Sequence, residues 1–417
     1  MPSRRLLGSF ENVKRKVCSH PYFGGETIKD PGQKARVHNG NEFPRSLCYL
    51  WGGNMKQKRL SSLDSLRGLA AIGVAIFYHY VHFKPQFGFP FSQKAYWLYQ
   101  YGWTLVDFFF VLSGFVFSYV YKKQIADRLI SLRDYCVNRL SRLYPLHILT
   151  LLVVAIIQFA RYVWEKEYFI YPYNDVYHFL LNLFFLQSGW FDMGWSFNAP
   201  SWSVAVEVMA YLLFFVVLYK LPNNKNYILI YIAFVLLGLT IKDIGLNVPI
   251  LNDKVARVLI GFFIGCLTYE IHIYINSLQR STKRIITFIL LCVLCYVVFL
   301  AITFGHGILG QWHMVYIILI YPLVLFLTLN IKLLNNALSI KPLSYLGYIS
   351  YSIYLWHFSV QLTIRTIDEL LQLNLNYSSK IVFFGYAFVT ITISIVSHEL
   401  FEKPFMNSIR RRMKRTS

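Results

Sequence analysis

Long apolar segments recur along this 417-residue chain, and they constrain its fold more than any other feature. Ten of them have about the length that crosses a bilayer as an α-helix. They cover residues 66–83, 101–121, 143–164, 203–219, 227–241, 255–274, 285–304, 312–331, 344–364 and 380–401. The sequence therefore predicts an all-α integral membrane protein with about ten transmembrane helices.

The composition supports this class. Hydrophobic residues make up 56% of the chain and charged residues only 15%, which leaves too little polar surface for a soluble globule of this length. The net charge of +21 could indicate a nucleic-acid partner, but Lys and Arg concentrate near both ends and between the apolar segments. This distribution fits loops on one side of a membrane, so we expect contact with membrane lipid and no nucleic-acid partner.

An eleventh apolar segment, residues 177–187, is short and carries His178 and Asn182. If it does not cross, both termini lie in the cytoplasm and the basic residues after it concentrate on the inside, as the positive-inside tendency requires. We therefore expect this segment to be re-entrant or interfacial, and the chain to be a multi-pass protein of the cell (inner or plasma) membrane.

The chain divides by composition into three parts. Residues 1–58 are polar and basic and lack the apolar core of a signal peptide. Because Met55 would also serve as a start, we expect either a disordered cytoplasmic extension or a start-site artefact. Residues 59–405 would form the membrane domain, and residues 406–417 a basic cytoplasmic tail.

The first apolar segment carries ionisable side chains at regular spacing. Arg67 and His79 are twelve residues apart, so on a continuous α-helix they share one face and lie about 18 Å apart along the axis. An ionisable residue inside a membrane span is costly and marks a functional site by default. This face of the first span is therefore a candidate site.

Three more acid–base side chains fall in the outer half of the predicted bilayer: Asp107, Glu207 and His357. Because lipid would not accept them, we expect them to converge with His79 on a polar interior. A purely structural interhelical hydrogen bond or ion pair is the alternative for each.

A second cluster is predicted at the cytoplasmic face, where Arg139 and Arg142 lie at the level of Arg67. Guanidinium groups bind phosphate in bidentate geometry, as an anionic donor would require, or they simply meet anionic lipid. We expect no metal site, since Cys292 and Cys295 lie in an apolar segment without His or carboxylate neighbours.

Short motifs follow one another in a fixed order between about residues 60 and 405. They are Leu-Asp-Ser-Leu-Arg-Gly-Leu-Ala-Ala at 63–71, Asp-Phe-Phe-Phe-Val-Leu-Ser-Gly-Phe at 107–115, Arg-Leu-Tyr-Pro at 142–145, Pro-Ser-Trp-Ser-Val-Ala-Val-Glu at 200–207, Tyr-Leu-Trp-His at 354–357 and Glu-Lys-Pro at 402–404. In this order they resemble the acyltransferase-3 family of integral membrane acyltransferases.

The resemblance implies an O-acyltransferase that moves an acyl group, in most relatives acetyl, from cytoplasmic acyl-CoA to a sugar hydroxyl in a surface or lipid-linked glycan. Acyl-CoA would be a co-substrate, with no permanently bound cofactor. The phosphates would meet Arg67, with Arg139 and Arg142. The general base would be His79, with Glu207 or Asp107 orienting it and His357 as a further candidate. Trp202 and Trp356 would bracket a sugar ring, with packing or an interface belt as the alternative.

One departure bears on the catalytic residue. Family members usually place the His eleven residues after the Arg, but here Tyr78 occupies that position and His79 follows. One residue rotates a helical side chain by about 100°, so either a local bulge absorbs the extra residue or the geometry differs. His82 is a weaker candidate for the base.

Two alternative functions stay open. The protein could be a transporter of a glycan or small solute, or an inactive acyltransferase-like assembly partner. A homo-oligomer is compatible with each function.

Overall fold

The computed structural model describes residues 59–222, 225–303 and 313–414. Within these ranges the chain forms helices and turns, with one isolated β-bridge between Val248 and Leu251. The prediction for residues 1–58 lies outside the described residues, as does the end of the predicted tail, residues 415–417.

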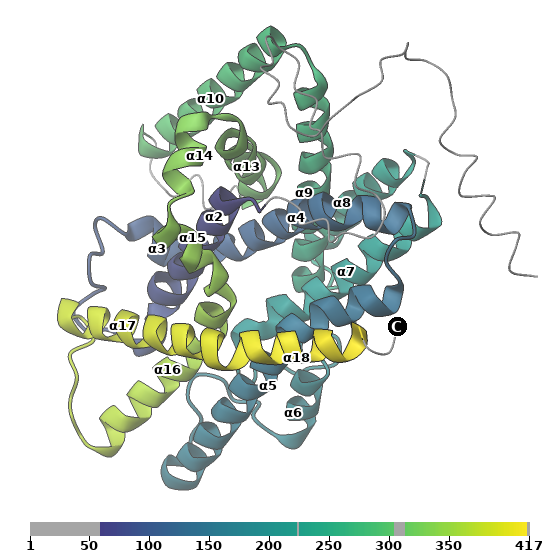
Figure 1. Cartoon of the computed structure of the whole chain (residues 1–417). Coiled ribbons are helices and arrows are strands. Elements are labelled where there is room, and N and C mark those ends of the chain that lie inside the picture. The colour runs from purple at the N-terminus through teal and green to yellow at the C-terminus, as the bar shows by residue number, and fades with distance from the viewer. Residues whose placement is uncertain (1–58, 223–224, 304–312, 415–417) are drawn as a thin grey trace, which may run out of the picture. The chain divides into compact units, whose positions relative to one another are not determined.

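The helices follow one another along the described chain as Figure 1 shows. They are α2 (Ser61–Ile72), η2 (Gly73–Phe77), η3 (Tyr78–Phe83), α3 (Tyr96–Tyr101), η4 (Gly102–Thr104), α4 (Leu105–Ala126), α5 (Leu132–Glu165), α6 (Val176–Leu183), η5 (Ala199–Ser201), α7 (Trp202–Lys220), α8 (Tyr227–Ile244), α9 (Asp253–Ser277), α10 (Arg280–Thr303), α12 (His313–Val315), η6 (Tyr316–Ile320), α13 (Tyr321–Asn330), α14 (Lys332–Leu338), α15 (Lys341–Tyr348), α16 (Ser350–Leu370), α17 (Lys380–Ser397), η7 (His398–Glu402) and α18 (Lys403–Lys414).

Nine helical segments of the described residues are long and apolar enough to cross a membrane. Helix α16 has 21 residues and the necessary length, but it is more polar, and it starts at Ser350 rather than at the predicted residue 344. Helix α6 has only eight residues, too few to cross. The structure thus confirms an all-helical membrane fold with a short helix near residues 177–187.

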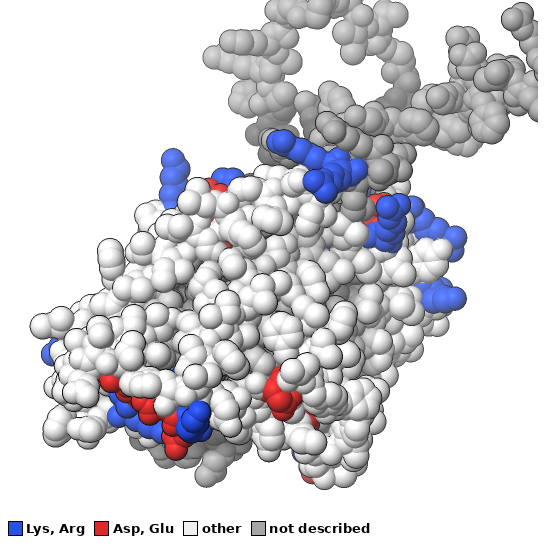
Figure 2. Space-filling view, turned by 90° about the horizontal axis from the view of Figure 1, so that it is seen from below, with Lys and Arg blue, Asp and Glu red and all other residues white. Residues whose placement is uncertain are grey.

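The distribution of surface charge agrees with this class. Figure 2 shows a broad face without charged side chains. Mostly Lys and Arg border it on one side, and charges of both signs border it on the other. A wide uncharged belt between charged edges is what a membrane-embedded surface requires.

Two glycines let α4 and α9 pack against each other at short range. A Cβ atom at Gly114 would overlap the carbonyl oxygen of Phe262, and one at Gly265 would overlap the carbonyl oxygen of Val111. Small residues at helix crossings allow such close backbone approach in membranes. Gly114 is therefore a packing residue that joins two helices of the scaffold.

Helix α5 begins earlier than its apolar segment indicates. Its N-cap is Ser131, whose hydroxyl accepts a hydrogen bond from the backbone N–H of Asp134 at 3.0 Å. Arg139 and Arg142 consequently lie on the helix itself rather than before it, about one turn apart along one side.

Candidate active site

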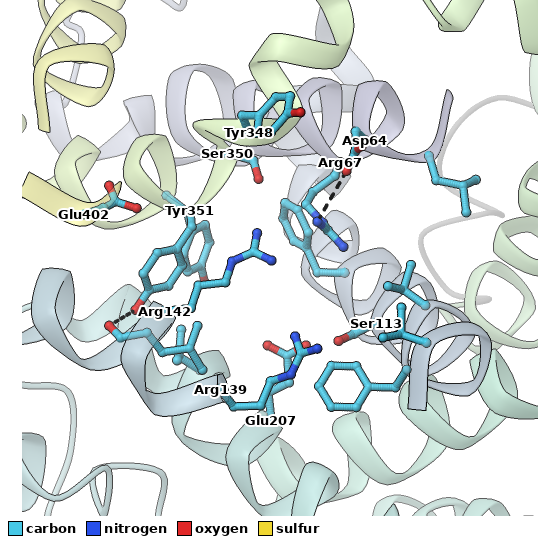
Figure 3. A pocket seen from close by; sticks show the side chains of 18 of the residues that line it. Asp64, Arg67, Ser113, Arg139, Arg142, Glu207, Tyr348, Ser350, Tyr351 and Glu402 are labelled. Atoms are coloured by element: carbon cyan, nitrogen blue, oxygen red, sulfur yellow. Dashed lines mark hydrogen bonds and ion pairs between the residues drawn. The ribbon is translucent and has the colours of Figure 1, made fainter. Parts of the chain in front are cut away.

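A cavity of about 840 Å³ opens among α2, α4, α5, α7, α16 and the η7–α18 segment (Figure 3). Its volume lies within the range of small-molecule binding sites. Polar and charged residues from distant parts of the chain line it, namely Arg59, Asp64, Arg67, Ser113, Arg139, Arg142, Ser203, Glu207, Tyr211, Ser350, Tyr351, Tyr354, His398, Glu399, Glu402 and Lys403. The cavity thus collects all three arginines predicted to bind phosphate.

The guanidinium groups of Arg67, Arg139 and Arg142 point toward the centre of this cavity (Figure 3). Arg67 lies 3.7 Å from a carboxylate oxygen of Asp64. Arg139 packs over the ring of Phe117 at 4.2 Å, and its Nε has no hydrogen-bond acceptor. Neither Arg139 nor Arg142 forms a salt bridge within the described residues.

Two carboxylates of the cavity, Glu207 and Glu402, have no described lysine or arginine within ion-pair distance. Glu207 lines the cavity beside Ser113 and Tyr211, whose hydroxyl oxygens lie 3.3 Å apart. Glu402 accepts a hydrogen bond from Ser352 and lies 3.5 Å from Nδ1 of His398. The guanidinium groups of Arg139 and Arg142 therefore face the cavity without a direct ion pair among the described residues, which leaves their N–H donors available to an anionic ligand.

The structure brings His79 of η3 against His357 of α16. Nδ1 of His79 lies 2.8 Å from Nε2 of His357, and the two rings are nearly parallel with centroids 4.8 Å apart. His357 is fully buried, whereas His79 is only half-buried. These two residues, 278 positions apart in the chain, form the histidine pair.

Hydrogen-bonding partners assign the protons of this pair. Nδ1 of His357 lies 2.7 Å from the carbonyl oxygen of Tyr354, which can only accept, so Nδ1 of His357 carries a proton. In the neutral ring Nε2 of His357 then accepts from Nδ1–H of His79. Neutral His79 consequently presents an unprotonated Nε2, the form that a general base requires.

Gln361 fixes the segment around His79. Its Nε2 donates to the carbonyl oxygen of His79 at 2.9 Å, and its Oε1 lies 3.2 Å from Nδ1 of His82. His82 stacks on His79 with ring centroids 5.1 Å apart. His82 therefore stacks beside the histidine pair, and its described hydrogen-bond contact is with Gln361 rather than with either member of the pair.

A bulge absorbs the extra residue between Arg67 and His79. The helix is α-helical to Ile72, continues as a π-helical turn from Gly73 to Phe77 and tightens to a 3₁₀ helix from Tyr78. A π turn accommodates one additional residue without breaking the helix. The segment is therefore not a continuous α-helix, and of the two alternatives left open by the sequence the structure shows the local bulge.

Tyr354 connects the cavity to the histidine pair. Its side chain lines the cavity and its hydroxyl binds Ser203 and the carbonyl oxygen of Pro200, while its own carbonyl oxygen accepts from His357. Phe109 packs against it with ring centroids 6.0 Å apart. One lining residue of the cavity is therefore linked through His357 to the candidate base His79, and neither histidine lines the cavity.

Asp107 lies in a separate buried network, so the predicted convergence of four acid–base groups is wrong. Its Oδ1 lies 2.8 Å from Nε of Arg257, and its Oδ2 lies 3.0 Å from Nη2 of Arg257 and 2.7 Å from Nε2 of His313. Asp107 is fully buried, and these contacts occupy both of its oxygens. Glu207, in turn, lies in the cavity, so the structure gives His79 an imidazole rather than a carboxylate as its partner.

The two predicted sugar-binding tryptophans have different surroundings. Trp202 is only 7% exposed and packs under the guanidinium group of Arg257, 5.0 Å from its ring centroid. Trp356 is half-buried on α16, and its indole N–H has no acceptor. The structure thus supports the packing alternative for Trp202.

Sequence reasoning missed several residues that build these clusters. Gln361 follows His357 by four positions and so shares its helix face, a signal that the sequence contained. Arg257 falls near the start of the predicted span at residues 255–274, and it lies in the first turns of α9 with a side chain only 12% exposed. His313 is the first residue of α12, near the start of the predicted segment at residues 312–331, and no local pattern connects it with Asp107.

A bundle of membrane-length helices around an arginine-lined cavity and a buried histidine pair defines a multi-pass membrane protein with a site for acid–base chemistry. The chain belongs to the acyltransferase-3 family, because the family model described as an acyltransferase domain matches residues 60–399.

Curated relatives carry O-acetyltransferase names. The Staphylococcus aureus (strain COL) protein named "Putative O-acetyltransferase SACOL0978" is 26% identical over 338 residues, which cover 73% of this chain and 51% of that protein. O-acetyltransferase OatA of Staphylococcus aureus (strain NCTC 8325) is 25% identical over 329 residues, which cover 72% of this chain and 50% of OatA. This chain therefore spans about half the length of these relatives. No solved structure gives a significant match.

Proposed function

We propose that the protein transfers an acyl group, acetyl as in the names of its relatives, from acyl-CoA to a hydroxyl of a sugar in a surface or lipid-linked glycan. The observation that carries this proposal is the arginine-lined cavity, one of whose lining residues, Tyr354, binds His357 of the histidine pair through its carbonyl oxygen. Unpaired guanidinium groups suit the phosphates of coenzyme A, and Nε2 of His79 suits an acceptor hydroxyl.

The chemistry follows from the proton positions. Nε2 of His79 takes the proton of the acceptor hydroxyl while the hydroxyl oxygen attacks the thioester carbonyl carbon. The carbon–sulfur bond breaks, and the imidazolium returns its proton to the leaving thiolate, which gives an ester and free coenzyme A. His357 keeps Nε2 toward Nδ1–H of His79, so it orients the base and shares its transient charge.

We place the cavity mouth and both termini in the cytoplasm, where acyl-CoA is found, and the protein in the cell membrane. The lining of the cavity supports this orientation, since it includes Arg59 before the first span and Lys403 at the start of α18. Basic residues at span ends favour the cytoplasmic side.

The test measures two products of the reaction, free coenzyme A and the acetylated glycan. Purified full-length protein should release coenzyme A from acetyl-CoA, and cells carrying it should gain glycan acetyl groups in the proton NMR spectrum of extracted polysaccharide. His79→Ala should lower the rate by about 10²- to 10⁴-fold, the usual contribution of a general base. Val81→Ala, an exposed position of the same 3₁₀ segment, is the matched control and should keep wild-type activity.

Two outcomes would contradict the proposal. Equal activity of His79→Ala and wild type at matched membrane levels would remove His79 from the chemistry. Movement of a glycan across the membrane without any coenzyme A release would favour the transporter.

A further inference from the structure

A second, smaller cavity of about 390 Å³ lies beside the arginine-lined cavity. The start of α2, the middle of α4, the second half of α9, the start of α10, the end of α13 and α14 enclose it. The two cavities share Arg59, Leu60 and Tyr119, so they meet at a common rim. An elongated ligand that occupied both cavities would have to cross this rim.

The smaller cavity has a polar lining without a carboxylate among the described residues. Its polar side chains are Ser61, Ser62, His272, Asn276, Lys283, Asn330, Asn335 and Ser339, together with Arg59 at the rim. The ammonium group of Lys283 contacts the side-chain oxygen of Asn276 and forms no salt bridge within the described chain. Its charge is therefore available to an anion.

The rest of the lining suits a heterocyclic base. Asn330 approaches Nδ1 of His272 at 3.3 Å, and Asn335 donates to Ser62 at 3.2 Å, so amide groups and an imidazole face a common space. Amides offer both donors and acceptors to a base edge, and the half-buried ring of Tyr269 in the same lining offers a stacking face. A cation, amides and an aromatic face together favour a phosphorylated nucleoside.

The shared rim is suited to the middle of such a ligand. Arg59 is 41% exposed there, pairs with Asp64 at 2.5 Å and lies over the ring of Tyr348. We propose that the smaller cavity binds the 3′-phosphoadenosine end of acyl-CoA. The diphosphate would then lie between Arg59 and the three arginines of the larger cavity, with the acyl-pantetheine arm beyond them. This assignment rests on the proposed function and names the subsite of its donor.

The first test is binding, which needs no turnover. Adenosine 3′,5′-bisphosphate is the probe, titrated calorimetrically into full-length protein in detergent. Lys283→Met should weaken its binding about tenfold, the value of one charge-assisted hydrogen bond. Lys332→Met is the matched control, because this lysine is exposed on α14 and lines neither cavity, and it should bind as wild type.

A second variant covers the case in which Lys283→Met fails to fold. Asn330→Asp places a negative charge in the same lining and should also weaken the probe. Absence of probe binding to wild type, or a loss with Arg142→Met but not with either of these variants, would overturn the subsite. Equal competition by inorganic pyrophosphate would overturn it too, since it would indicate a site for phosphate alone, such as a lipid headgroup.

A kinetic test separates the subsite from the proposed function. Lys283→Met should raise the KM for acetyl-CoA about tenfold and leave the KM for acetyl-pantetheine, which lacks the nucleotide, unchanged. An equal change for both donors would overturn the subsite while leaving acyl transfer intact. Failure of wild type to release thiol from either donor would overturn the proposed function, even if the nucleotide probe still binds.

Discussion

Two clusters of charged side chains lie inside the helical bundle, and they differ in how completely their charges are paired. Around Asp107, every carboxylate oxygen meets Arg257 or His313, and the guanidinium group of Arg257 also lies over the rings of Trp103 and Trp202. In the arginine-lined cavity, no described carboxylate lies within ion-pair distance of Arg139 or Arg142, although Glu207 lines the same cavity.

The difference separates architecture from function. A fully paired cluster holds α4, α9 and the start of α12 together and offers nothing to a ligand. A cluster whose guanidinium groups make no direct ion pair keeps N–H donors that a ligand can use. Acidic and basic residues inside a membrane span therefore indicate function only after their partners are known.

The largest effect is expected from Asp107→Asn. It leaves the nearly buried guanidinium group of Arg257 without its counter-charge, and breaking a buried pair costs about 3–5 kcal/mol. The melting temperature of the purified protein and its level in membranes should fall. The double variant Asp107→Asn/Arg257→Met should recover part of the loss. A single variant as stable as wild type would show that the pair is dispensable and would break the comparison.

Arg142→Met should weaken donor binding without lowering stability, in contrast to Asp107→Asn. Since no salt bridge of Arg142 is lost, the melting temperature should stay the same or rise, while the KM for acetyl-CoA should rise about 10- to 100-fold, the value of a charged hydrogen bond to phosphate. Arg142→Lys should fall between the two, because an ammonium group cannot bind in bidentate geometry. A lower melting temperature with an unchanged KM would place Arg142 with the architectural cluster.

Variants of His357 test how the candidate base is oriented. His357→Leu removes the acceptor for Nδ1–H of His79 and should lower kcat about tenfold with an unchanged KM for the donor. His357→Gln offers an amide oxygen in its place and should lose less. Equal losses in both variants would indicate that His357 serves packing alone.

The smallest effect is expected from deleting one residue of the π turn. Without Ala75, the turn from Gly73 to Phe77 would become α-helical and the spacing from Arg67 to the histidine would be eleven, so thiol release should change little. Deleting Leu69 from the regular α-helical part is the control. That deletion would rotate the following residues by about 100° and should abolish activity. Equal losses would show that the π turn does not absorb the insertion.

The fold was largely predictable from the sequence. Nine predicted spans match helices of sufficient length and hydropathy in the described chain. The tenth corresponds to α16, which is more polar and carries His357 of the histidine pair. The short helix α6 also lies where the short apolar segment at residues 177–187 was predicted. Boundaries were less predictable, as for α5, because a cap such as Ser131 extends a helix beyond its apolar segment.

The sequence by itself determined where the spans lie, which ionisable residues they contain and the motif order that identifies the family, because hydropathy and short motifs are local properties. Only the tertiary structure decided that His79 meets His357, that Arg257 and His313 take Asp107, and that Arg139 and Arg142 face a cavity unpaired. Such partnerships depend on the rotation of each helix about its axis, and one residue changes that rotation by about 100°. The π turn before His79 is such a one-residue adjustment, and packing against α16 and α17 selects it.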